Sequence, residues 1–162
     1  MMSTHGKVMT GIDAIEAVRQ AVDRVEASMS QSIRVSTSRL ITHASSAASR
    51  VSELEAQLRS TEADLHQAES KLAQMEHEDE EGKTVSTVLD HQHVGALQAK
   101  ANNLNQELRN AKSRASSCQM RVDDFSIYAS DVVSESGSIC GHTRDFLRRL
   151  EDHVTQYGAH HG

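Results

Sequence analysis

The chain has 162 residues, of which 37% are hydrophobic, 25% are charged and 2% are aromatic, and it contains no proline. This length predicts one domain, and the scarcity of aromatic side chains and proline favours few turns and a thin apolar seam over a thick core. The net charge of −6 disfavours nucleic acid and anionic membranes as partners. No stretch is typical of a membrane span or a secretory signal, so we expect a cytoplasmic protein. Export by a route that needs no cleaved signal is an open alternative.

The first expected element is a long helix over residues 11–80, preceded by a flexible tail, residues 1–9. Thr10 can cap this helix, because a threonine side chain accepts hydrogen bonds from the free N–H groups of the first turn. Apolar residues then recur at steps of three and four, which is the spacing of one helix face. They include Ile12, Ile15, Val18, Val22, Val25, Met29, Ile33, Leu40, Ala44, Ala47, Val51, Leu54, Leu58, Leu65, Ala68, Leu72 and Met75. Gly82, which follows an acidic run, predicts that the helix ends near residue 80.

A turn over residues 81–87 is expected to lead into a second helix, residues 88–157, and then a flexible tail, residues 158–162. Along this helix the same steps of three and four continue without a break. The expected seam is Val94, Leu97, Ala101, Leu104, Leu108, Ala111, Ala115, Cys118, Val122, Phe125, Ala129, Val132, Ser136, Ile139, Thr143, Phe146, Leu150, His153 and Tyr157. A heptad rhythm held for this long predicts a supercoiled helix, and a short turn makes neighbouring helices antiparallel.

The sequence therefore predicts an all-α fold, a long antiparallel two-helix coiled-coil hairpin that forms a single domain over residues 10–157. Folding at the turn places residues that are equally far from Lys83 opposite each other. The middle of the hairpin, where Ala44–Ser49 would face Ser117–Val122, is rich in alanine and serine on both helices. Small side chains allow close approach but bury little area, so we expect this middle to be the softest part.

The open end of the hairpin, where both termini would lie, carries more apolar residues than a two-helix seam can cover. A second stripe recurs there at every seventh residue beside the first, and a face this wide is typical of a bundle with more helices. We expect this end to pack against another copy or a helical protein partner. The expected interface residues are Ile15, Val18, Val22, Val133, Cys140, Phe146, Leu147, Leu150 and Val154. The alternative is a kink at Gly137–Gly141 that folds the last helix back over the stripe.

The chain has ten histidines, and three of them would gather at the turn beside acidic residues. His77, His91 and His93 are weak candidates for a metal site, but their spacing matches no metal motif, and the preferred interpretation is a solvated acidic tip without metal or cofactor. Cys118 and Cys140 would lie too far apart on one helix to form a disulfide. No nucleophile elbow or phosphate-binding glycine loop occurs, so we expect no catalytic site and no enzymatic activity.

The expected function is that of a non-enzymatic structural or adaptor protein, which mediates protein–protein assembly through the open end. The alternative is a secreted helical-hairpin cargo or a secretion chaperone. The predicted hairpin is similar, in shape only, to the helical-hairpin substrates of type VII secretion. Their Trp-x-Gly turn is absent, since the chain reads Glu81-Gly82-Lys83 at this point, and the last residues do not supply their usual export signal.

Overall fold

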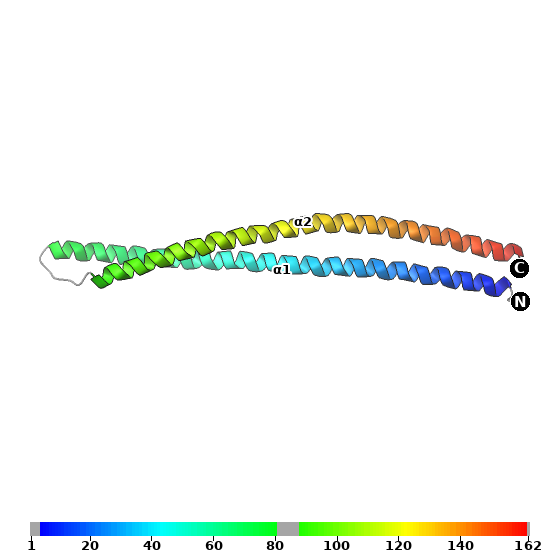
Figure 1. Ribbon diagram of the computed structural model, residues 1–162, viewed down its shortest axis with the longest axis horizontal. Coiled ribbons are helices and arrows are strands. Elements are labelled where there is room, and N and C mark those ends of the chain that lie inside the picture. The colour runs from blue at the N-terminus through cyan, green and yellow to red at the C-terminus, as the bar shows by residue number, and fades with distance from the viewer. Residues whose placement is uncertain (1–3, 81–87, 162) are drawn as a thin grey trace. The chain divides into compact units, whose positions relative to one another are not determined.

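A computed structural model describes residues 4–80 and 88–161, with the side chains of residues 10–76 and 88–158. It contains two helices, α1 (Thr4–Glu80) and α2 (Val88–His161), which pack against each other (Figure 1). All residues in the two described ranges are helical. The prediction of an all-α helical hairpin is therefore confirmed.

The helices extend beyond their predicted ends. Helix α1 begins at Thr4 rather than after Thr10, and α2 continues to His161 rather than stopping at residue 157. No proline stands in these flanking segments, and a lone glycine such as Gly158 disfavours a helix by only about 1 kcal/mol. The predicted turn, residues 81–87, lies outside the described residues.

Contacts between the helices divide the chain into two compact units. We call Met1–Arg39 together with Asp123–Gly162 the terminal unit, and Leu40–Val122 the central unit. Each unit pairs one segment of α1 with one segment of α2. Each is therefore a two-helix structure with its own seam.

The central unit is built on a leucine seam at the predicted positions. Its buried cluster consists of Leu54, Leu58, Ala101, Leu104, Leu108 and Ala111, with Val51 packed against it. Ion pairs between the helices lie on both sides of this seam, from Arg50 to Glu107 at 3.4 Å and from Lys112 to Glu55 at 2.9 Å. At 3.6 residues per turn, Arg50 and Glu55 leave α1 on opposite sides of the direction in which Leu54 points.

Two ion pairs of the central unit follow the predicted register, whereas the pair of Arg50 with Glu107 is offset from it by nine residues along α1. Equal distance from Lys83 would place Lys112 opposite Leu54, and Lys112 pairs with the next residue, Glu55. In the same way His91 would face Met75, and His91 pairs with Glu76 at 3.4 Å. These two pairs therefore align the helix segments of the central unit as the sequence predicts.

The alanine- and serine-rich middle buries less than the leucine seam does. Ala44, Ala47, Ala115, Cys118 and Val122 are only half buried. A groove of about 660 Å³ opens beside these positions, where small side chains do not fill the space between the helices. These positions are less buried than the cluster around Leu54, and the softness expected of this segment stays a prediction.

The terminal unit pairs the amino-terminal segment of α1 with the carboxyl-terminal segment of α2, which Figure 1 shows in blue beside orange and red. Gly11 lies so close to α2 that a Cβ placed on it would meet a methyl group of Val154 at 3.3 Å. Arg144 pairs with Asp23 at 2.7 Å. Because α2 runs unbroken through Gly137 and reaches these contacts, the alternative of a helix folded back at Gly137–Gly141 is wrong.

The seam of the terminal unit differs from the prediction on α2. Ile139 and Phe146, which the heptad pattern placed in the seam, are 65% and 56% exposed, whereas Cys140 and Leu147 are 8% and 5% exposed. The seam therefore moves from the first stripe to the second one after Ser136. Consecutive steps of four, from Val132 to Ser136 and on to Cys140, make a stutter, which locally unwinds a supercoil and turns the next stripe toward α1.

Candidate protein interface

The terminal unit has two different flanks, one on each side of its seam. On α1 the seam runs along Ile15 and Val22, and 3.6 residues per turn place Val18 and Val25 on one side of it and Arg19 on the other. On α2 the seam runs along Cys140 and Leu147. Ile139 and Phe146 leave α2 on one side of that line, and Arg144 and Glu151 on the other.

One flank carries ion pairs between the helices. Arg144 pairs with both Asp23 and Glu26, and Arg19 pairs with Glu151 at 2.7 Å. The hydrogen bond to Glu26 raises the pKa of the Arg144 guanidinium above its ordinary value, and the bond to Glu151 does the same for the pKa of Arg19. These side chains remain partly exposed, where ion pairs contribute little to stability. Their main effect is to align the helices on this flank.

The other flank exposes large apolar side chains, and we call it the apolar face. It consists of Val18 and Val25 on α1 with Ile139, Phe146, Leu150 and Tyr157 on α2, all of which are exposed. Glu135, Thr143 and His153 lie among the α2 members. A continuous exposed surface of this kind marks an interaction site more often than isolated surface hydrophobic residues do.

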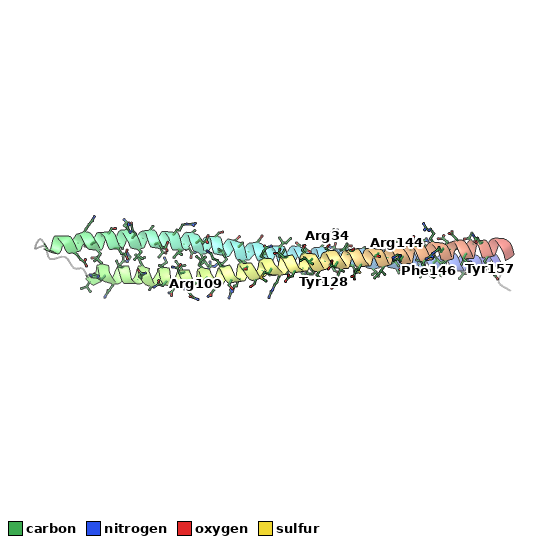
Figure 2. All side chains as sticks on the ribbon, turned by 90° about the horizontal axis from the view of Figure 1, so that it is seen from above. Arg34, Arg109, Tyr128, Arg144, Phe146 and Tyr157 are labelled. Atoms are coloured by element: carbon green, nitrogen blue, oxygen red, sulfur yellow. The ribbon has the colours of Figure 1, made fainter. Side chains whose placement is uncertain are left out.

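The α1 and α2 members lie on the same side of the paired helices. Two antiparallel helices are related by a two-fold axis that is perpendicular to both helices. Rotation about this axis exchanges the helices but leaves each flank of the pair on the same side. Residues that leave α1 and α2 in the same rotational sense from the seam therefore share a flank. Figure 2 labels Tyr128 and Phe146 toward one edge of this unit and Arg144 toward the other. The apolar face therefore spans both helices.

The two halves of the apolar face differ in side-chain size. Between the valines on α1 the face presents Ala14, Ala21, Ser28 and Ser32. The α2 half presents an isoleucine, a leucine and two aromatic rings at the positions given above. The side chains of the apolar face therefore project less from α1 than from α2.

A shallow groove of about 270 Å³ lies on the same flank. It is lined by Ser28, Met29, Ser32, Ile33, Ser36, Phe125, Tyr128 and Val132. The rings of Phe125 and Tyr128 have centroids 6.3 Å apart and planes tilted by 47°, and Tyr128 is exposed. The groove extends the apolar surface along the terminal unit beyond Ile139.

The nine residues predicted as an interface fall into three groups. Val18, Phe146 and Leu150 lie on the apolar face. Ile15, Cys140 and Leu147 are buried between the helices, and Val22 and Val154 are half buried there. Val133 is exposed, but it lies about three turns before Arg144 and so on the charged flank.

Sequence reasoning assigned Val25, Ile139 and Tyr157 to the seam rather than to an interface. The exposure of Ile139 and Tyr157 follows from the shift of the α2 seam by one stripe. The sequence pattern did not distinguish the two stripes of α2, because a step of three from Ser136 to Ile139 and a step of four from Ser136 to Cys140 both fit a helix. Val18 and Val25, which the sequence also placed in the seam, are exposed because the α1 seam runs along Ile15 and Val22 instead.

The histidine candidates near the turn do not converge in the part of the chain that the structure describes. His91 contacts Glu76, and His93 lines a groove together with Asp90 and Lys71, and the positive charge of the lysine disfavours a bound cation. Within the described side chains, no three His, Cys, Asp or Glu residues gather in an arrangement that could hold a metal ion. The side chain of His77 lies outside them.

Neither helix contains, within the described residues, a segment long and apolar enough to cross a membrane. Comparison with known protein families finds no matching model, and comparison with curated proteins and with solved structures finds no significant match.

Proposed function

We propose that this chain is a non-enzymatic adaptor that assembles with protein through the apolar face of its terminal unit. The observation that carries the proposal is the exposure of Ile139 and Phe146 on a flank that they share with the valines of α1. Fully burying a side chain of this size stabilises by about 1.5–3 kcal/mol. Several of them on one flank supply enough free energy to hold a partner.

The central unit offers a contrast that supports this choice of surface. Its seam is bordered on both sides by charged side chains, those of Arg50 with Glu107 and of Lys112 with Glu55. Its exposed apolar residues include Ile41 on α1 and Met120 on α2, and neither belongs to that seam. Scattered residues of this kind are ordinary on a protein surface.

Replacing Ile139 by glutamate tests the proposal, with Ile127→Glu as the matched control. Both isoleucines are 65% exposed on α2 of the terminal unit, but Ile127 points away from the apolar face. We expect the tagged chain, in gentle extracts of the cells that produce it, to migrate in a complex larger than one chain. Ile139→Glu releases the single chain, and Ile127→Glu leaves the complex intact.

A wild-type chain that migrates alone, both in such extracts and after purification, contradicts the proposal. An unchanged complex with Ile139→Glu contradicts the choice of surface. Intact chain in the culture medium without cell lysis would instead support the alternative of a secreted helical hairpin.

A further inference from the structure

We propose that the partner on the apolar face is a second copy of this chain, seated so that α2 of each copy lies over α1 of the other. This inference rests on the proposed function, because it uses the same surface. It adds the identity of the partner and the orientation of the two copies.

The relief of the apolar face provides the first argument. Arg144 pairs with Asp23, so antiparallel helices place Phe146 at the level of Ala21. The same register places Ile139 at the level of Ser28. At each of these levels a large side chain on α2 therefore stands beside a small one on α1. The face carries both ridges and hollows, which is what a surface needs in order to fit a copy of itself.

The symmetry of a pair provides the second argument. If the two-fold axis runs parallel to the helices, α2 of one copy covers α1 of the other at the same level, and Phe146 of each copy meets Ala21 of the other. If the axis runs across the helices, small residues face small residues and rings face rings, which leaves voids along α1 and crowding along α2. Close packing favours the first arrangement.

The charges of the terminal unit provide the third argument. With the apolar faces together, the flank that carries Arg19 and Arg144 with their carboxylate partners points away from the contact and stays in water. The α1 half of the face contributes alanine, valine and serine between Ala14 and Ser32. No charged side chain of that half is therefore desolvated when α2 of the second copy covers it. Glu135 is the acidic residue of the α2 half, and 3.6 residues per turn place it at the edge of the face that is farther from α1.

Exchanging a large and a small side chain between copies tests this arrangement. We expect the purified wild-type chain to have twice the mass of one chain by light scattering. Ala21→Phe sets two rings at one level, and Phe146→Ala removes the ridge, so each variant alone should self-associate at least about tenfold more weakly. Both positions are exposed in the single chain, and circular dichroism checks that each variant remains helical.

Mixing the two variants in equal amounts gives the decisive result. In a mixed pair every level has one ring and one small side chain, so we expect the mixture to regain the mass of two chains with an affinity near that of the wild type. A mixture that stays monomeric overturns the orientation, and a purified wild-type chain that is monomeric overturns the self-association. If that monomer still enters a larger complex in cell extracts, and Ile139→Glu still disrupts the complex, the proposed function stands and only the identity of the partner is wrong.

Discussion

The central and terminal units are both pairs of antiparallel helices, but the side chains on the two sides of their seams differ. In the central unit Arg50 and Lys112 form ion pairs between the helices on opposite sides of a leucine seam. In the terminal unit the ion pairs of Arg19 and Arg144 lie on one side, and Ile139 and its neighbours are exposed on the other. In the central unit, two helices therefore suffice to bury the large side chains of the seam and to pair the charges beside it. The terminal unit retains exposed apolar surface that a partner can cover.

The largest expected effect comes from the seam of the central unit. Leu54→Ala removes a side chain that is 1% exposed and leaves a cavity, so we expect the free energy of unfolding to fall by about 2–5 kcal/mol. Urea denaturation followed by circular dichroism measures this loss. The mass of the complex should stay unchanged under native conditions, and a fall in mass would break the division of roles between the units.

A smaller loss is expected for Leu147→Ala in the terminal unit. Leu147 is buried against α1, but Cys140 and Val154 beside it on the seam are small, and the seam can relax around the change. We expect the free energy of unfolding to fall by about 2 kcal/mol in the same denaturation experiment. If Leu147→Ala instead weakens assembly and leaves stability unchanged, Leu147 is an interface residue and the observed seam is wrong.

The two cysteines give a milder probe of the same difference. Cys140 is buried in the terminal seam, and Cys118 is half buried beside the groove of the central unit. We expect a maleimide reagent to label Cys118 at least about tenfold faster than Cys140, because labelling of a buried thiol requires local opening. Mass spectrometry of timed samples measures both rates. Equal rates would show that the terminal seam opens as readily as the alanine-rich middle.

The smallest effect concerns the ion pairs of the central unit. The hydrogen bond from Lys112 lowers the pKa of Glu55 below its ordinary value. A carboxyl group with a lowered pKa in the folded state stabilises the fold above its unfolded pKa, and this contribution is lost as the pH falls through the folded pKa. The pair is exposed, so we expect the difference in Tm between neutral and acidic pH to shrink by less than about 2 °C in Lys112→Ala.

Arg148→Ala is a suitable control for that experiment, since Arg148 pairs with Asp145 within the same helix and lies in the other unit. A larger change in its pH profile than in that of Lys112→Ala would contradict the assignment to Glu55.

The sequence was informative about the central unit because one stripe of large side chains dominates there. Leu54, Leu58 and Leu104 have no apolar stripe beside them, so the rhythm predicts the buried positions directly. Near the termini Ile139 and Cys140 belong to two adjacent stripes, and either stripe fits a helix. The expected open-end interface was therefore a mixture of buried residues such as Leu147 and exposed ones such as Phe146.

The sequence by itself determined that the chain forms two long helices, because apolar steps of three and four and the absence of proline leave few other folds. It also predicted how the helices align, because a short connection sets the register. Only the tertiary structure decided which stripe of α2 faces α1. The stripe that contains Cys140 and Val154 is the one packed against α1. With this stripe at the seam, Gly11 approaches Val154 closely and Arg144 forms its ion pair with Asp23. The physical reason is that burial against α1 depends on the shape of both helices together, and a periodic pattern describes only one helix at a time.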